Sequence, residues 1–305
     1  MDPLISTPFD EQSTADEVLE GVSLSGRSAL VTGGSSGIGL ETARALARSG
    51  ATVTLAVRNP DMGARAAREI AETTGNDDVR VQELDLLSVS SISNFSKRWN
   101  SPLHMLVLNA GVMAVPTLER SARGHEVQFA TNYLGHFALT MNMYPWLERA
   151  TGARVVSVSS MAHYFSPVVF DDIDFHERPY DPWSAYGQSK TADILLAVEI
   201  TRRWSSAGIC ANALNPGAIP TNLQRYTGEV LTPVEKRKTP QQGAATSVLL
   251  AASPLVAQAG GRYFEDCNEA PVVSEPEMFG GGVNPWAIDP ENAQRLWELS
   301  IPFVS

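Results

Sequence analysis

The chain has 305 residues, of which 43% are hydrophobic and 19% are charged, so it can bury a core of ordinary size without disulfide or metal support. Its formal net charge of −11 argues against nucleic-acid and anionic-membrane partners, because phosphate groups would repel it. It contains only two cysteines, Cys210 and Cys267, so neither a disulfide framework nor a cysteine metal site is expected.

The N-terminal 21 residues are acidic and lack the basic and apolar blocks of a signal peptide. The sequence also lacks the run of about 18 apolar residues that marks a transmembrane helix. Both features predict a cytoplasmic protein that does not span a membrane. In that compartment the two cysteines are expected to be reduced thiols.

Short β-branched segments alternate with longer amphipathic segments along the chain. The predicted strands are Ser28–Thr32, Thr52–Val57, Val79–Glu83, His104–Leu108, Val155–Ser159, Cys210–Leu214 and Arg262–Phe264. The predicted helices are Ile38–Ser49, a segment that opens at Asn59, about Gly124–Ala150, Tyr186–Ser206, about Gln241–Ala252 and about Pro290–Ser300. This alternation predicts an α/β fold with one doubly wound parallel sheet that carries helices on both faces.

No linker-like stretch separates two compositions, so residues 1–305 are predicted to form one domain. Within it, residues 1–25 read as an N-terminal extension, and residues 161–185 and 218–240 as loops over the active-site edge. Residues 265–305 read as an irregular cap that ends in a helix. Trp286, Trp297 and Phe303 are expected to anchor this cap to the core or to a partner subunit.

A glycine-rich turn joins the first predicted strand to the first predicted helix. It runs from Thr32 to Gly39 and contains three further glycines, at positions 33, 34 and 37. Glycines let the backbone turn tightly and approach a ligand, and the helix N-terminus offers free N–H groups to a phosphate. A glycine-rich turn can also occur with no ligand. The strand–turn–helix context favours a pyrophosphate site of a dinucleotide.

The end of the second predicted strand should decide which dinucleotide binds, since an acid placed there favours NAD(H). This chain has Val57, Arg58 and Asn59 at that point, and none of them is acidic. Arg58 can hold a 2′-phosphate through a bidentate, charge-assisted contact. A solvated surface arginine is the alternative interpretation. NADP(H) is therefore predicted in preference to NAD(H).

Tyr186 and Lys190 stand four residues apart in a predicted helix, so they share one face. A free phenol has a pKa of about 10, and a neighbouring cation should lower that pKa and favour proton transfer. This spacing is common by chance. The serines at positions 157, 159 and 160 add weight, because they lie at the carboxyl end of a predicted strand, where such folds bind ligands.

Taken together, these motifs resemble those of the short-chain dehydrogenase/reductase family, from about Leu24 to Phe264. The family's TGxxxGxG motif is matched by Thr32–Gly39 and its NAG motif by Asn109–Gly111. Its YxxxK motif is matched by Tyr186 and Lys190. Its helix asparagine is matched by Asn132, and its serine by Ser160, with Ser159 as the alternative. Asp85 and Leu86 resemble the adenine contact, and residues 216–221 resemble the loop that binds the nicotinamide amide.

This resemblance implies a set of site residues. The catalytic residues would be Asn132, Ser160, Tyr186 and Lys190. The residues in contact with the cofactor would be Gly33, Ser35, Ser36, Gly37, Ile38, Gly39, Arg58, Asn59, Asp85, Leu86, Asn109, Ala110, Gly111, Tyr186, Lys190, Pro216, Gly217, Ile219 and Thr221.

The resemblance also implies a mechanism. Tyr186 would exchange a proton with the oxygen of a carbonyl or alcohol while hydride moves to or from the nicotinamide. Ser160 would hydrogen-bond the substrate oxygen. Lys190 would lower the pKa of the phenol and hold the ribose, and Asn132 would hold a water that links Lys190 to solvent.

The segment between Ser160 and Tyr186 is about twice as long as is usual in the family. With the motifs around it, it resembles the branch of retinol dehydrogenases, WW-domain oxidoreductases and protochlorophyllide reductases. That branch acts on bulky, largely apolar substrates. Met161, His163, Tyr164 and Trp183 are expected to line the substrate pocket, and no metal is expected.

Two alternatives to a carbonyl/alcohol oxidoreductase remain at this point. A C=C reductase of the enone or protochlorophyllide type would use the same tyrosine and lysine. A dinucleotide-sensing regulator without catalysis is the alternative from another class of protein. The family resemblance further suggests a homodimer or homotetramer that acts on a small-molecule substrate.

Overall fold

The computed structural model describes residues 3–228, 232–277 and 280–304. At its centre is an eight-stranded sheet with the strand order β3-β2-β1-β4-β5-β6-β7-β8. The strands are β1 (Ser28–Thr32), β2 (Thr52–Val57), β3 (Val79–Glu83), β4 (Met105–Leu108), β5 (Ala153–Val158), β6 (Ile209–Asn215), β7 (Tyr263–Glu265) and β8 (Asn268–Glu269). The first seven pair in parallel and β8 pairs antiparallel to β7. The predicted doubly wound fold is confirmed.

The strand order reverses between β1 and β4, which pair side by side in the middle of the sheet. To one side the chain continues to β2 and β3, and to the other side to β5, β6 and β7. Successive connections therefore leave the carboxyl edge in opposite directions at this point, and a crevice opens between them. Every residue of β1 and β4 is buried, which is typical of parallel strands covered on both faces.

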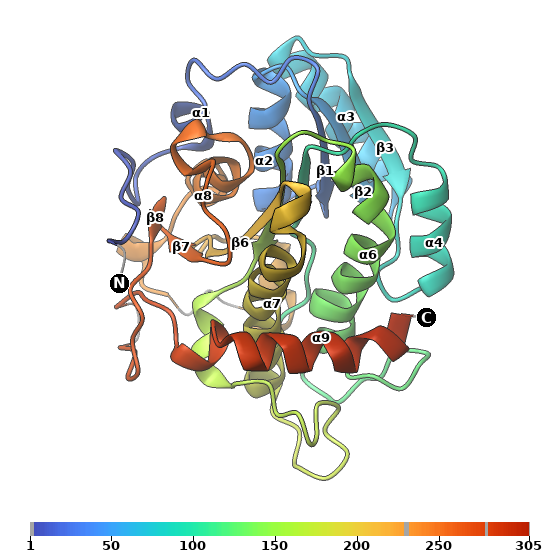
Figure 1. The fold of residues 1–305 in the computed structure, drawn as a ribbon, viewed down its shortest axis with the longest axis vertical. Coiled ribbons are helices and arrows are strands. Elements are labelled where there is room, and N and C mark those ends of the chain that lie inside the picture. The colour runs from blue at the N-terminus through green and yellow to red at the C-terminus, as the bar shows by residue number, and fades with distance from the viewer. Residues whose placement is uncertain (1–2, 229–231, 278–279, 305) are drawn as a thin grey trace.

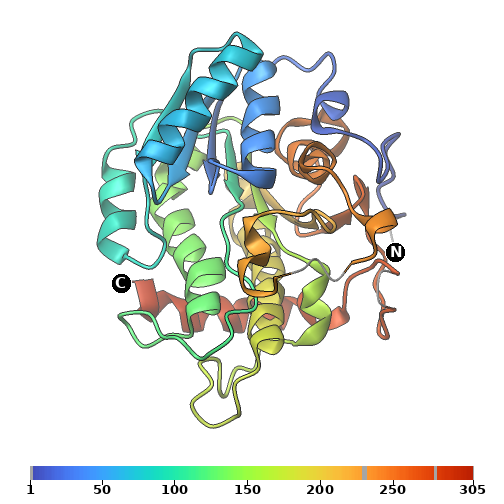
Figure 2. The same cartoon turned by 180° about the vertical axis from the view of Figure 1, so that it is seen from behind.

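Helices cover both faces of the sheet (Figures 1 and 2). One layer contains α1 (Ala15–Val18), α2 (Gly37–Arg48), α3 (Pro60–Thr74) and α8 (Pro240–Ala252). The other contains α4 (Val89–Lys97), α6 (Gly135–Glu148), α7 (Pro182–Trp204) and α9 (Pro290–Val304). Each layer buries its own apolar cluster against the strands. Among the described residues, no helix is both long and apolar enough to cross a membrane.

The long helix expected over residues 124–150 is interrupted. It consists of α5 (Val127–Phe129), a π-helical turn (Ala130–Leu134) and α6. It begins only at Val127 because the buried carboxylate of Glu126 accepts the N–H groups of Gln128 and Phe129, at 2.9 and 2.7 Å. The π turn carries Asn132, and π turns are frequent at functional sites.

Helix α7 begins four residues earlier than expected. Asp181 caps it by accepting the N–H of Ser184 at 2.7 Å, and Pro182 occupies its first position. Tyr186 therefore lies in the second turn, where the helical conformation is fixed on both sides, and does not open the helix. Helix α4 was not predicted because its sequence is dominated by serine and other polar residues.

The segments expected as loops contain short 3₁₀ helices. These are η2 (Met161–Phe165) in the first segment, and η4 (Asn222–Tyr226) and η5 (Val234–Lys236) in the second. Isolated helical turns of this length produce little periodicity in a sequence. The hydrophobic pattern therefore predicted irregular loops for both segments. Both segments follow the carboxyl ends of strands, β5 and β6 respectively.

The C-terminal helix α9 lies across α7 (Figure 1) and is anchored by Trp297. The indole is buried and packs edge-on against Phe137 of α6 and Trp204 of α7, with ring centroids 4.9 and 5.6 Å apart. Ser300 of α9 also shares a hydrogen bond of 2.8 Å with the hydroxyl of Tyr133. The cap is therefore part of the hydrophobic core.

Replacing Trp297 with Ala should lower the free energy of unfolding by about 3–5 kcal/mol, because it empties a buried aromatic site. Leu299, two residues along the same helix and 38% exposed, is the matched control. Leu299→Ala should cost less than about 1 kcal/mol. Equilibrium unfolding in urea measures both values, and equal losses would contradict an anchoring role of the indole.

Candidate active site

A cavity of about 920 Å³ follows the carboxyl edge of the sheet. It extends from Arg58, after β2, past the ends of β1 and β4 to Trp183 on α7. Each residue expected to contact the cofactor lines this one cavity, although these residues come from six separate parts of the sequence. The strand order explains this, since it brings the carboxyl ends of β1, β2 and β4 next to one another.

The glycine turn is shaped to receive a ligand. Gly33 has a φ of +67°, a conformation that favours glycine. A side chain at Gly39 would come within 2.7 Å of the carbonyl oxygen of Gly33, so the turn and the start of α2 can approach closely only with glycine there. The side chain of Ser36, at the N-cap of α2, makes no capping hydrogen bond. The first N–H groups of α2 therefore have no side-chain partner and face the cavity.

The hydroxyl of Thr32, at the end of β1, fastens the turn to the neighbouring strand. It accepts the N–H of Asn109 at 2.8 Å and the N–H of Ala110 at 3.0 Å. The Asn109 amide also donates to the carbonyl oxygen of Thr32 at 2.8 Å. These contacts fix the backbone after β4 against the glycine turn, so both line the cavity in one rigid arrangement.

The two serines after β5 have different surroundings. Ser159 is buried and its hydroxyl donates to the backbone oxygen of Lys190 at 2.7 Å, so it ties β5 to α7. Ser160 caps η2 by accepting the N–H of Ala162 at 3.1 Å, and its side chain lies close enough to Tyr186 to lower the pKa of the phenol. Ser160 is thus the serine that faces the phenol.

Lys190 is held at two points. Its Nζ donates to the backbone oxygen of Val158 at 2.9 Å and to Oδ2 of Asp193 at 2.8 Å. The ammonium lies 5.7 Å from the centre of the Tyr186 ring. The side chains of both members of the ion pair are more than nine-tenths buried. Its charge is therefore screened very little by solvent.

The pKa of Tyr186 differs in direction from what its neighbour alone predicts. Burial raises the pKa of the phenol above its ordinary value, and this outweighs Lys190 and the Ser160 hydrogen bond, which lower it. Asp193 adds to the rise in the Tyr186 pKa. Tyr186 is therefore a neutral phenol at neutral pH.

Asn132 lies behind the cavity wall and does not line it. Its side-chain amide donates to the backbone oxygen of Val112 at 2.9 Å and to the Ser189 hydroxyl at 2.8 Å, and it accepts the N–H of Val112 at 2.8 Å. Its backbone oxygen is bonded by Nδ1 of His136 at 2.7 Å. These contacts occupy most of the groups that would bind the water expected between Asn132 and Lys190.

His136 was not assigned a role from the sequence. Its burial lowers its pKa to about 3, so the ring is neutral and Nδ1 donates to Asn132. Nε2 then accepts from the Thr32 hydroxyl at 2.9 Å. His136 therefore links the glycine turn to the π turn that carries Asn132. A signal was present, since His136 follows Asn132 by one helical turn.

Asp193 was also missed, although it stands three residues after Lys190 in the same helix. Burial raises the pKa of its carboxyl, and the neighbouring ammonium opposes this rise. Its other oxygen, Oδ1, is buried and has no hydrogen-bond partner among the described residues. Helical spacing would have placed the two side chains together, but only their burial gives the pair its importance.

Two of the four residues expected in the substrate pocket lie elsewhere. Met161 and Trp183 line the cavity. His163 instead donates from Nδ1 to the backbone oxygen of Ser160 at 2.8 Å and accepts the N–H of Asn284 at Nε2, while the hydroxyl of Tyr164 donates to the backbone of Gly282. Both rings point away from the cavity because η2 turns them toward the C-terminal segment, which they hold in place.

Around Trp183 the cavity wall is largely apolar. The ring of Trp183 lies edge-on to Phe165 and to Tyr186, with centroids 5.9 and 6.4 Å apart. The apolar side chains here, from four parts of the chain, are Val112, Met113, Met161, Ala162, Phe165, Trp183 and Leu223. The phenol of Tyr186 therefore meets a wall suited to an apolar molecule.

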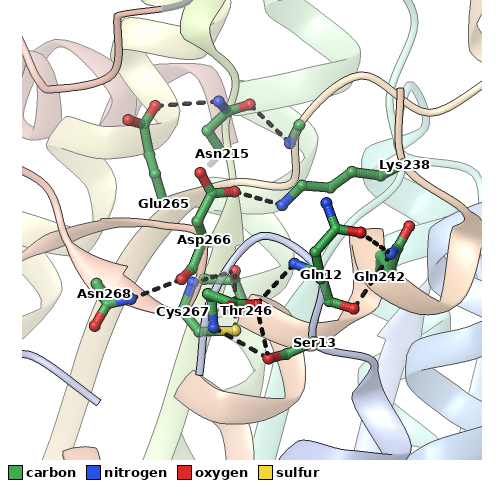
Figure 3. A network of polar contacts seen from close by, with 12 residues as sticks. Gln12, Ser13, Asn215, Lys238, Gln242, Thr246, Glu265, Asp266, Cys267 and Asn268 are labelled. Atoms are coloured by element: carbon green, nitrogen blue, oxygen red, sulfur yellow. Dashed lines mark hydrogen bonds and ion pairs between the residues drawn. The ribbon is translucent and has the colours of Figure 1, made fainter. Parts of the chain in front are cut away.

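The loop after β6 is fixed from two sides (Figure 3). Asn215 donates to the Glu265 carboxylate at 3.1 Å and accepts the N–H of Gly217 at 3.2 Å. Lys238 covers Gly217 and forms an ion pair with Asp266. The strand β7 and the segment after it thus hold this part of the cavity wall.

In the described part of the chain, no cluster of His, Cys, Asp and Glu side chains could hold a metal.

Curated relatives cover nearly the whole chain. A probable oxidoreductase of Streptomyces lividans is 50% identical over 295 residues, which span 92% of this chain and 99% of that protein. Retinol dehydrogenase 11 of Mus musculus is 37% identical over 286 residues, which span 92% of this chain and 86% of that protein. The resemblance to a branch with members like retinol dehydrogenase is therefore confirmed.

Solved structures share the fold. A protein from Mycobacterium paratuberculosis superimposes with a TM-score of 0.75 and 35% identity, over 96% of this chain and 97% of that one. A short chain dehydrogenase from Escherichia coli CFT073, solved with NADPH, has a TM-score of 0.66 and 26% identity, over 80% and 97% of the two chains. The family profile described as short chain dehydrogenase matches residues 27–231. The chain belongs to the short-chain dehydrogenase/reductase family.

Proposed function

We propose that the protein is an NADP(H)-dependent oxidoreductase that interconverts a carbonyl and an alcohol on a bulky, largely apolar substrate. One observation carries the proposal. A single cavity has the glycine turn and Arg58 at one end, and Tyr186 with Ser160 in an apolar wall at the other. A ligand that fills the first end extends toward the phenol at the second.

The residues present fit a nicotinamide dinucleotide. The glycine turn leaves room that a side chain would fill, and the N–H groups at the start of α2 are suited to a pyrophosphate. Arg58 is exposed at the rim of the cavity, where its guanidinium can grip a 2′-phosphate. A neighbour of known structure binds NADPH, which supports the choice. When bound, this cofactor supplies or accepts the hydride.

The chain's own groups handle the proton. Tyr186 is a neutral phenol that can donate its proton to the oxygen of a carbonyl in the apolar part of the cavity. Ser160, which lies beside Tyr186 in the cavity wall, can hold the same oxygen as negative charge develops on it. Lys190 offsets the negative charge left on the phenol oxygen after transfer. In the reverse direction Tyr186 takes the proton from the alcohol.

Tyr186→Phe should lower kcat for carbonyl reduction by about 10²–10⁴-fold, because the variant has no proton to donate. NADPH affinity should change little. The measurement is NADPH oxidation with retinal, steroid ketones and aromatic aldehydes, alongside NADPH fluorescence for binding. Tyr144→Phe removes a surface hydroxyl and serves as the control. Near wild-type turnover in Tyr186→Phe would refute the mechanism, and consumption of an enone alone would favour C=C reduction.

The two serines provide a matched pair. Ser160→Ala should lower kcat by about 10²–10³-fold with little loss of stability, since its hydroxyl is assigned to the developing charge. Ser159→Ala should lower the free energy of unfolding by about 0.5–1.5 kcal/mol, because it removes the buried hydrogen bond that ties β5 to α7. Turnover and urea unfolding are measured for both. The assignment fails if Ser159→Ala loses turnover and Ser160→Ala keeps it.

Arg58→Ala should weaken NADPH binding by about 10- to 100-fold through loss of the charge-assisted contact, and should leave NADH binding within about threefold. Arg65→Ala removes the same charge from an exposed position on α3 that does not line the cavity. Titration calorimetry with each cofactor gives the comparison. Equal weakening of both cofactors, or equal effects of both variants, would contradict the role of Arg58.

A further inference from the structure

The ion pair that Lys190 makes with Asp193 is not used in the mechanism above, which involves Lys190 alone. It forms within α7 at the i, i+3 spacing, with an N–O distance of 2.8 Å, and both side chains are more than nine-tenths buried. An unpaired oxygen on a buried carboxylate is costly, and Asp193 has one in Oδ1. Because this carboxylate lowers stability and lies next to a residue of the candidate active site, we looked for a function that it could serve there.

The hydrogen bond from Lys190 to Asp193 helps to fix the direction in which the Lys190 ammonium points. Lys190 has three N–H bonds to donate. One goes to the backbone oxygen of Val158 and one to Asp193, and both of these contacts are buried. One N–H bond remains for the space between Tyr186 and the cavity. Without Asp193, the flexible lysine stem would be held only by Val158.

Asp193 also acts on the site through its negative charge. The titratable groups from other elements that interact with the pair or with Tyr186 are His136 of α6, Tyr133 of the π turn and Tyr263 of β7. Burial lowers the pKa of the histidine and raises the pKa of each phenol, so all three are neutral near pH 7. The charges that act on Tyr186 are therefore those of Lys190 and Asp193, and they oppose one another.

We propose that Asp193 is a positioning residue that fixes the ammonium of Lys190 and offsets its charge, so that the site keeps Tyr186 as a neutral proton donor. The proposal rests on the proposed function, in which Tyr186 is the acid and base. It assigns Asp193 no contact with substrate or cofactor. Its consequence is a site biased toward carbonyl reduction at neutral pH, because a lone ammonium would favour the phenolate that alcohol oxidation needs.

A direct test measures the ionisation of Tyr186 in the cofactor-free protein. Tyrosine labelled with carbon-13 at Cζ is followed by NMR against pH, and the Tyr186 signal is assigned by its absence from Tyr186→Phe. In Asp193→Asn, which keeps the shape and removes the charge, the midpoint should fall by about one pH unit or more relative to wild type. Asp193→Glu keeps the charge and should stay near the wild-type midpoint. An unchanged midpoint in Asp193→Asn would overturn the proposal.

A rate measurement supplies a second readout. With a carbonyl substrate that the wild-type enzyme reduces, the alkaline limb of kcat/KM should move to lower pH in Asp193→Asn by the same interval, and Asp193→Glu should restore it. A purely structural role predicts a lower plateau at every pH with no movement of the limb, and that result would also overturn the proposal.

A third variant covers the case in which Asp193→Asn does not fold. Lys190→Met with Asp193→Leu removes both charges and leaves no buried ion unpaired. The proposal expects its Tyr186 midpoint to lie close to wild type, whereas Lys190→Met alone should raise the midpoint. A double variant that behaves like Lys190→Met alone would contradict the offset. Because the NMR titration needs no substrate, a Tyr186→Phe enzyme that turned over normally would refute the proposed function separately.

Discussion

The site depends on the hydroxyl of Thr32, which joins the two halves of the sheet where the strand order reverses. It accepts two backbone N–H groups from the end of β4 and bonds the ring of His136, which in turn holds the π turn. One side chain thus couples the glycine turn, the segment after β4 and Asn132. Thr32, His136 and Asn132 are all buried, and the histidine is neutral, so these contacts are shielded from solvent.

Burial governs the chemistry of the other end of the cavity. Burial raises the pKa of Tyr186 although Lys190 lowers it. It also strengthens the electrostatic effect of each charged neighbour on the phenol, since buried charges are screened less by solvent. The counter-charge of Asp193 therefore matters to the phenol even though Asp193 does not line the cavity. Acid/base behaviour here follows from a set of buried groups and not from the tyrosine–lysine spacing alone.

Features set by local sequence were predictable. The bounds of β1, β2 and β3 match their β-branched runs, and the glycine turn, the two serines and the tyrosine–lysine spacing all pointed to one cavity edge. The structural features that the sequence did not predict share one cause. The π turn, the early start of α7 and the turn of His163 away from the cavity depend on caps and packing partners that lie far away in the sequence or outside the periodic pattern.

By itself the sequence determined the doubly wound order of strands and helices and the family, because hydrophobic periodicity and motif spacing are local properties of the chain. Only the tertiary structure decided which serine faces Tyr186, which way the pKa of Tyr186 moves and that Asp193 is the partner of Lys190. Those outcomes depend on burial and on distances between side chains. The physical reason is that desolvation and Coulomb energy depend on position in three dimensions, which residue spacing along the chain does not record.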